Sequence, residues 1–184
     1  MTQWSIRISV TAATVWTLVV GEPQALRSGG SWVTLCGVSG WTGEIRALAP
    51  DEVERVAAVL GLARLDQDNG VYLVAWEGGE PAGHARLAFI EPPELQDLAV
   101  RPEQRRRGVA SALLAAVDGE ARSRGFGRIR LQVSADNGPA QALFRACGYM
   151  DVGIPPQRVR GTILLRTGPL DVDDTLLTWE KTRP

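Results

Sequence analysis

Cysteine and histidine are scarce in this sequence of 184 residues, which contains two cysteines and a single histidine. Cys36 and Cys147 lie far apart and match neither a CxxC redox pair nor the ligand spacing of a zinc site. We therefore expect a reducing compartment, the cytoplasm, with no metal site, and a Cys147 that packs in the core. His84 alone excludes a multi-histidine metal site, and a Ser-His-Asp or Cys-His arrangement would have to use this one residue.

A strong net charge and a long apolar run are also missing. The formal net charge is −1, so we expect neither nucleic acid nor an anionic membrane surface as a partner. The run Ile8–Val20 is too short and polar for a membrane span, and without a small-residue cleavage site it also argues against a signal peptide. This length, with 45% hydrophobic residues, predicts one compact domain.

The composition changes once along the chain, near residue 43. Residues 1–43 hold four of the six tryptophans but only three charged residues, whereas the sequence from Glu44 onward is charged and periodic. We expect residues 1–43 to be an N-terminal extension of uncertain order, an added edge element, or residues upstream of the native start. Residues 44–184 are expected to form a single domain.

Strand and helix patterns alternate in the first half of this domain. The strand "EIRAL" precedes a helix over "PDEVERVAAVLG", which we expect Asp51 to cap and Gly61 to end. The runs "VYLVAWE" and "AGHARLAFI" predict a hairpin with the turn "GGEP", and "ELQDLAV" predicts a third strand.

The second half continues the alternation. An apolar stripe predicts a helix over Gly108–Arg122 that ends at Gly125, and "RIRLQVS" predicts a half-buried strand. Asn137 or Gly138 is expected to cap a third helix that ends at Gly148, and "LLTWEK" is the last expected strand. The order β-α-β-β-β-α-β-α-β-β predicts an α+β fold with a mixed central sheet of about six to seven strands flanked by helices.

The densest positive charge precedes the second expected helix, in the stretch "VRPEQRRRGVASALL". A helix N-terminus next to glycine offers free backbone N–H groups, and arginines can add charge-assisted hydrogen bonds, so a pyrophosphate suits this stretch. The alternative is a solvated basic turn that caps the helix. Walker A and Rossmann glycine patterns are absent from the sequence.

Two stretches together, "LAVRPEQRRRGVASALL" and "VSADNGPAQALFRACGY", resemble the GNAT superfamily of acyl-CoA-dependent N-acyltransferases. The signature Q/R-x-x-G-x-G/A falls on Arg105, Gly108 and Ala110. A second pattern, N-x-x-A-x-x-L-Y/F-x-x-x-G-F/Y, falls on Asn137, Ala140, Leu143, Phe144, Gly148 and Tyr149. The resemblance covers residues 44–184.

The resemblance implies acetyl-CoA as co-substrate and no metal. It implies that loop amides bind the pyrophosphate, that one strand backbone pairs with the pantetheine arm, and that the acetyl group lies where the two central strands splay apart. The cofactor-binding residues implied are Leu98, Ala99, Val100, Arg105, Arg106, Arg107, Gly108, Val109, Ala110, Ser111, Asn137, Ala140 and Phe144.

The catalytic groups are less well marked. Glu94 lies where family members often carry an acidic residue and is the candidate base, Asp97 is the second candidate, and both could instead be solvent-facing strand residues. His84 is expected to be a partly exposed sheet residue. Many members carry tyrosine at the position of Phe144, whose ring cannot protonate a departing thiolate, and Tyr149 is expected to be a core residue instead.

The function implied is an N-acetyltransferase that moves an acetyl group from acetyl-CoA to a primary amine of a small molecule or peptide. Attack would be direct, in a ternary complex, and the protein a cytoplasmic monomer or homodimer. The alternative is a non-catalytic acyl-CoA-binding module or sensor, which Phe144 keeps open. The acceptor is not identified, although the segment Val152–Asp174 is expected to border its site.

Overall fold

The computed structural model describes residues 40–63, 65, 69–182 and 184. The predictions for Cys36 and for residues 1–39 lie outside the described residues. Of the proposed extension, Trp41 is described, and it packs against the main hydrophobic core. Cys147 lies in that core, as predicted, but it is disulfide-bonded and so does not only pack there.

The described residues form an α+β fold, which confirms the predicted class. In chain order the elements are β1 (Glu44–Ala47), η2 (Pro50–Glu52), α1 (Val53–Leu60), β2 (Gly70–Glu77), β3 (Glu80–Ala88), β4 (Glu94–Val100), η3 (Pro102–Gln104), α2 (Val109–Ser123), β5 (Arg128–Ser134), α3 (Gly138–Ala146), β6 (Met150–Asp151), β7 (Gln157–Leu165) and β8 (Gly168–Thr182). In the described residues the sheet has eight strands rather than the six to seven expected, and the two-residue β6 is the strand that was not expected. The predicted strand "LLTWEK" is only the end of β8, which is 15 residues long.

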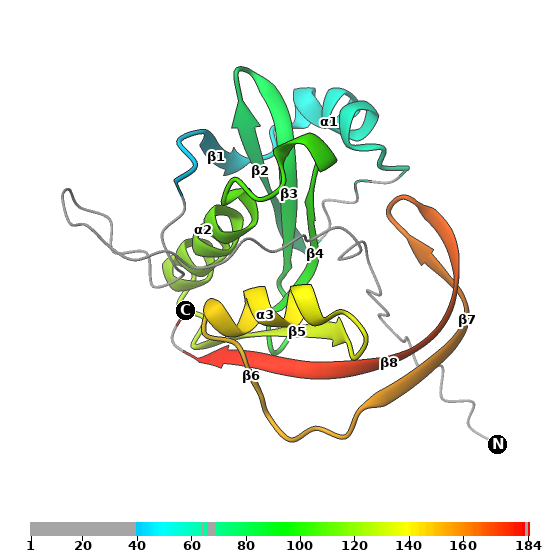
Figure 1. Ribbon diagram of the computed structural model, residues 1–184. Coiled ribbons are helices and arrows are strands. Elements are labelled where there is room, and N and C mark those ends of the chain that lie inside the picture. The colour runs from blue at the N-terminus through cyan, green and yellow to red at the C-terminus, as the bar shows by residue number, and fades with distance from the viewer. Residues whose placement is uncertain (1–39, 64, 66–68, 183) are drawn as a thin grey trace.

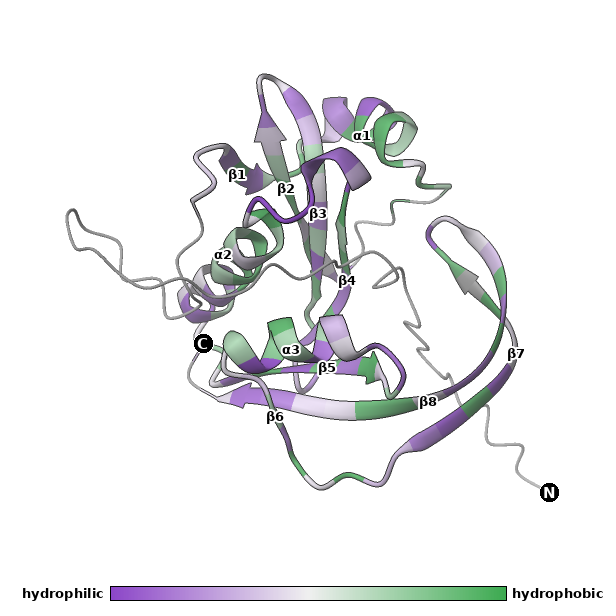
Figure 2. Ribbon diagram, in the orientation of Figure 1, coloured by the Kyte–Doolittle hydropathy of each residue, from purple (hydrophilic) through white to green (hydrophobic). Residues whose placement is uncertain are grey.

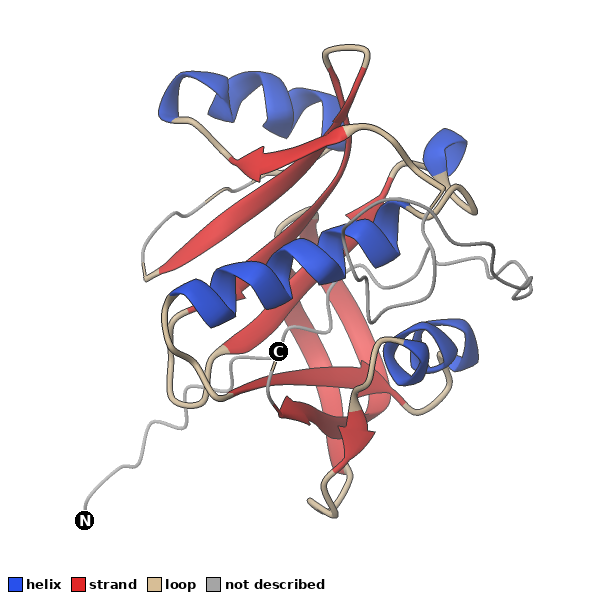
Figure 3. Cartoon of the chain, turned by 90° about the vertical axis from the view of Figure 1, so that its left-hand side faces the viewer, coloured by secondary structure: helices blue, strands red, loops and turns tan. Residues whose placement is uncertain are grey.

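All strands belong to one mixed sheet (Figures 1 and 3). Its order is β1-β2-β3-β4-β5-β8-β6, and β7 pairs with β8 as well. The pair β4 and β5 is parallel, whereas the other pairs are antiparallel. A parallel pair needs a crossover, and α2 supplies it between β4 and β5.

Alternate residues of β2 serve two hydrophobic clusters. Leu73 belongs to the main cluster, which also contains Leu113 of α2 and Phe144 of α3. Tyr72 belongs to the second cluster, which contains Val56 of α1. Because neighbouring strand residues point to opposite faces, α1 and α2 cover opposite faces of the sheet.

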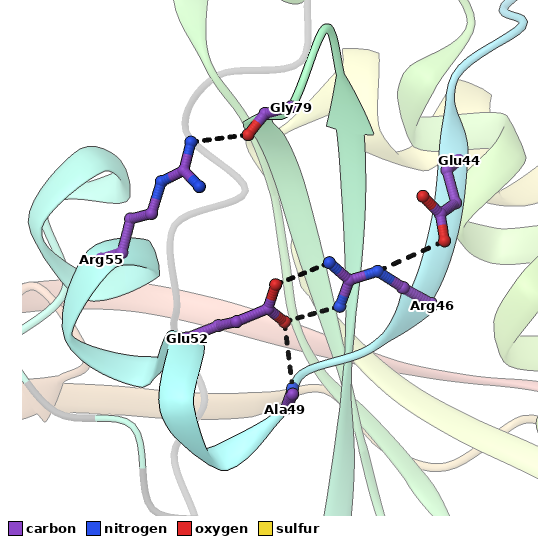
Figure 4. A network of polar contacts seen from close by, with 6 residues as sticks. All are labelled: Glu44, Arg46, Ala49, Glu52, Arg55 and Gly79. Carbon is purple, nitrogen blue, oxygen red and sulfur yellow. Dashed lines mark hydrogen bonds and ion pairs between the residues drawn. The ribbon is translucent and has the colours of Figure 1, made fainter.

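The start of the first helix differs from the prediction (Figure 4). Asp51 does not cap it: the chain forms η2 first, and the carboxylate of Glu52 accepts a hydrogen bond of 3.3 Å from the backbone N–H of Ala49. Glu52 also forms an ion pair with Arg46 of β1. This contact holds the pKa of Glu52 below its usual value, chiefly through the hydrogen bond from Arg46. Arg46 on β1 therefore makes Glu52, and not Asp51, the residue that organises the start of the helix. The sequence pattern alone does not distinguish these two acidic residues.

The other helix boundaries follow the prediction. Gly61, Gly125 and Gly148 have φ values of 66°, 74° and 87°, so each of these glycines ends its helix in the left-handed conformation. Asn137 caps α3, because its side chain accepts a hydrogen bond of 3.1 Å from the N–H of Ala140.

Candidate functional site

The strands β4 and β5 pair only over the first two residues of β4, opposite the middle of β5. Their ladder consists of two pairs, Glu94 with Arg130 and Leu95 with Leu131. Beyond this point β4 stays paired with β3 up to Val100, and β5 stays paired with β8 up to Ser134. Among the described residues no strand pairs with the β5-facing edge of β4 after Leu95, and an extended ligand can pair with the backbone of this open edge (Figure 1).

The loop after β4 brings an unusual backbone to the start of α2. Arg106 and Gly108 both have left-handed φ values, 59° and 88°. Gly108 is the N-cap residue of α2 and has no side chain that could accept a hydrogen bond. The first-turn N–H groups of α2 therefore have no side-chain acceptor at the N-cap. Figure 2 shows that this loop is strongly hydrophilic. The donors, the helix dipole and the charge suit an anion.

The three arginines of the loop differ in their contacts. Arg105 donates from Nε to the backbone oxygen of Val100, at 3.3 Å. Arg107 forms an ion pair with Glu77 at the end of β2. No hydrogen bond or ion pair links the Arg106 side chain to another described residue. Of the three arginines, Arg106 therefore has its whole guanidinium left for a ligand, whereas Arg105 uses its Nε and Arg107 uses both Nη groups.

Glu94 is the first residue of β4 and lies where the two strands separate. Its side chain is buried, with the residue 8% exposed, so the solvent-facing alternative for Glu94 is wrong. Gln96 contacts Glu94 across 3.5 Å, and Arg86 of β3 donates a hydrogen bond to Gln96. A carboxylate in this polar group lies next to the open edge of β4.

Asp97, the second candidate, is held in a buried ion pair. Its Oδ2 accepts a hydrogen bond from Nε of Arg166, which lies in the turn between β7 and β8, and Asp97 is 1% exposed. The backbone oxygen of Arg166 accepts a hydrogen bond of 2.6 Å from Ala63, after α1. The hairpin tip is thus anchored to β4, and part of the segment Val152–Asp174 reaches the candidate site.

Breaking this ion pair should destabilise the fold. Arg166→Met would leave the Asp97 carboxylate buried without its counter-charge, so we expect the free energy of unfolding to fall by about 3 kcal/mol. Urea titration followed by circular dichroism measures this change. Arg158→Met is the matched control, since Arg158 lies on the same hairpin but is exposed beside Asp173, and its loss should cost less than about 0.5 kcal/mol. Equal stability of the two variants would show that the Asp97 pair contributes nothing.

His84 of β3 corrects a prediction. It is 2% exposed rather than partly exposed, and neither ring nitrogen has a hydrogen-bond partner among the described residues. Burial lowers the pKa of His84, and nearby Asp97 opposes this effect while Arg166 adds to it. His84 is buried within the sheet, away from solvent, so Glu94 stays the candidate base.

Phe144 and Tyr149 lie together under α3. Both are buried, and their rings meet edge to face with centroids 5.8 Å apart. Burial raises the pKa of Tyr149 well above its usual value, and the charge of Asp118 adds to the rise. Tyr149 is therefore a core residue, as predicted, and it keeps its proton near neutral pH.

Several polar residues of this region escaped the sequence analysis. Arg86, Gln96 and Arg166 carry no local motif, and they reach Glu94 and Asp97 only through sheet pairing and a hairpin that returns to β4. The same holds for Glu77, which contacts a loop 30 residues away. Only the alternation of residues within β3 and β4 could have indicated that Arg86 and Asp97 share a face. In the structure these two residues are opposite each other in the β3–β4 ladder.

In the described part of the chain, no group of three or more histidine, cysteine or acidic side chains could hold a metal ion. No helix there is long and apolar enough to cross a membrane.

Comparison with known proteins adds independent findings. A model of the acetyltransferase (GNAT) family matches residues 41–149. The chain is 41% identical over 64 residues to mycothiol acetyltransferase of Clavibacter michiganensis and 27% identical over 100 residues to streptothricin acetyltransferase of Streptomyces lavendulae. These matches cover 35% and 53% of this chain, and 21% and 53% of the two relatives, so the chain spans only part of each.

Solved structures show the same fold. The ribosomal-protein-S18-alanine N-acetyltransferase of Escherichia coli superimposes with a TM-score of 0.60 at 18% identity. That alignment covers 77% of this chain and 94% of the other.

Proposed function

Because the chain belongs to the GNAT acetyltransferase family and is thereby an acyltransferase, we propose that it acetylates a primary amine. The donor is acetyl-CoA, the co-substrate of this family, and the acceptor is a small molecule or peptide. The amine attacks directly, in a ternary complex.

The observation that carries this proposal is the open edge of β4 beside an uncapped α2. The edge from Gln96 to Val100 offers backbone groups to an extended pantetheine arm, with Leu98, Ala99 and Val100 as its proposed partners. The loop supports a pyrophosphate, with Arg106 and the N–H groups from Gly108 to Ser111 as proposed ligands. The two features are joined by one short segment, so a single ligand can reach both.

Glu94 is the proposed base. Acetyl-CoA supplies the acetyl group as a thioester, which is already activated toward an amine. An amine is mostly protonated near neutral pH, so it must lose a proton, and the Glu94 carboxylate lies beside the point where β4 and β5 part. Phe144 has no acidic proton to donate, and burial raises the pKa of Tyr149, which makes its hydroxyl a weaker acid than usual. We therefore propose water as the proton source for the departing sulfur.

The acceptor must be found by experiment. The relatives are named for unlike acceptors, mycothiol, streptothricin and a ribosomal-protein alanine. The cytoplasmic location, the monomeric or homodimeric state and the domain boundary at residue 44 remain predictions from the sequence.

A thermal shift is the first test. Acetyl-CoA at about 100 times its Kd should stabilise the native state by about 2.7 kcal/mol and raise Tm, whereas acetate should have no effect. Differential scanning fluorimetry measures the shift. An unchanged Tm at saturating acetyl-CoA would refute cofactor binding.

Turnover with a panel of amines is the second measurement, with acetylated products detected by mass spectrometry. Acetyl-CoA binding without any product from small-molecule or peptide amines would instead favour the non-catalytic module, for which Phe144 is the only observation.

A further inference from the structure

Arg107 lies within the loop proposed to bind pyrophosphate, yet its guanidinium is already engaged. Nη1 donates a hydrogen bond of 2.6 Å to one carboxylate oxygen of Glu77, and Nη2 donates to the other. Gln104 accepts a further hydrogen bond from Nη1. Such a fork-to-fork pair fixes the direction of the guanidinium as well as its position.

The pair joins two distant parts of the chain. Glu77 is the last residue of β2, at the turn of the β2–β3 hairpin, whereas Arg107 lies between two left-handed residues, Arg106 and Gly108. A second tie links the start of the loop to β3, because the N–H of Arg101 donates a hydrogen bond of 2.9 Å to the oxygen of Ala82. The loop is thus held at both ends against the β2–β3 hairpin.

Stability does not account for this arrangement. The side chains of Arg107 and Glu77 are 48% and 31% exposed, and exposed ion pairs contribute little to the free energy of folding. The hydrogen bond from Arg107 holds the pKa of Glu77 below its usual value, although burial acts in the opposite direction. The pair therefore persists near neutral pH, where the loop would bind its ligand.

A loop with two left-handed residues has other backbone conformations within reach, because the Arg106 conformation is itself unfavourable for a residue with a side chain. The apparent affinity for a ligand falls by the fraction of molecules whose loop is in the binding conformation. A contact that holds Arg107 beside Glu77 keeps that fraction high.

We propose that Glu77 is a positioning residue for acetyl-CoA, and that Arg107 braces the loop against β2 rather than binding the phosphates. The proposal rests on the function proposed above. It divides the roles of the three arginines: Arg107 and Arg105 hold the loop, while Arg106 and the backbone N–H groups contact the pyrophosphate.

The direction in which one substitution changes the Kd for acetyl-CoA shows whether Arg107 braces the loop or binds the phosphates. Glu77→Gln removes a negative charge near the proposed anion site, so charge alone would strengthen acetyl-CoA binding. Loss of the brace would weaken it. We expect Kd to rise about fivefold in isothermal titration, the scale of a well-formed exposed ion pair, with KM rising alike and kcat unchanged.

A double-mutant cycle provides the internal check. In an Arg107→Met background the brace is already gone, so Glu77→Gln should leave Kd unchanged or lower it. Glu80→Gln is the matched control, since Glu80 lies on the same hairpin and pairs with Arg55, and its Kd should stay within about twofold of wild type. Tm of the free proteins should not move with Kd.

The possible results distinguish failure of the brace from failure of the proposed function. An unchanged or lower Kd for Glu77→Gln in the otherwise wild-type chain, with wild type binding normally, would overturn the brace and leave the proposed function intact. Failure of the wild type to bind acetyl-CoA would overturn both. A rise in Kd that is equally large in the Arg107→Met background would also overturn the brace, because Glu77 would then act without Arg107.

Discussion

Gly108→Glu should weaken acetyl-CoA binding by at least about 100-fold, because it acts on the loop in two ways. Gly108 has a φ of 88°, a conformation that costs a residue with a Cβ about 1–2 kcal/mol. The new carboxylate would also stand at the N-cap of α2, where it can cap the first-turn N–H groups and repel a pyrophosphate. Isothermal titration measures the affinity, and circular dichroism reports whether the fold is kept.

The other end of the same helix provides the control. Gly125 follows α2 with a φ of 74°, and apart from its chain neighbours no atom of the described residues lies within 4 Å of the place where a Cβ would be built. Gly125→Glu therefore introduces the same backbone strain and the same charge away from the loop. We expect it to lower stability slightly and to leave acetyl-CoA affinity within about threefold of wild type. Equal affinities for the two variants would mean that the loop only starts a helix.

Local patterns predicted the elements that carry the loop. The stripe Val109, Leu113, Leu114 and Val117 predicted α2, and all four residues are fully buried. Gly61, Gly125 and Gly148 marked helix ends because each end requires a left-handed residue, which is a local demand. The order of strands and helices then followed, because each element had its own periodic signal.

Contacts between distant segments could not be predicted in this way. The burial of His84 depends on neighbours from β2 and β4 on both sides of β3, and the Asp97 pair depends on a hairpin tip that lies 69 residues further along the chain. Glu52 rather than Asp51 organises the start of the first helix because Arg46 is placed beside it by β1. In each case the contact is made with a residue on another element, so the pattern of neighbouring residues in the sequence does not predict it.

Glu94→Gln should lower kcat/KM by about 100- to 10,000-fold, the usual contribution of a general base, while acetyl-CoA affinity stays nearly unchanged. The wild type should show an acid limb in the pH profile of kcat/KM, because a protonated carboxylic acid cannot accept the proton of the amine. The variant should lose that limb. Steady-state rates across pH, together with titration of acetyl-CoA, measure both quantities.

Asp97→Asn is the comparison that separates the two carboxylates of β4. Asp97 is already bound to Arg166 and is 1% exposed, so its substitution should act first on stability, and the remaining folded protein should keep most of its rate. Glu94 is the first residue of β4 and lies where β4 and β5 separate, so its substitution should act first on the rate. A loss below about threefold for Glu94→Gln would show that it is a bystander. If neither substitution lowers the rate, the amine reaches the site already neutral or loses its proton to water, and the protein contributes by holding the two reactants together.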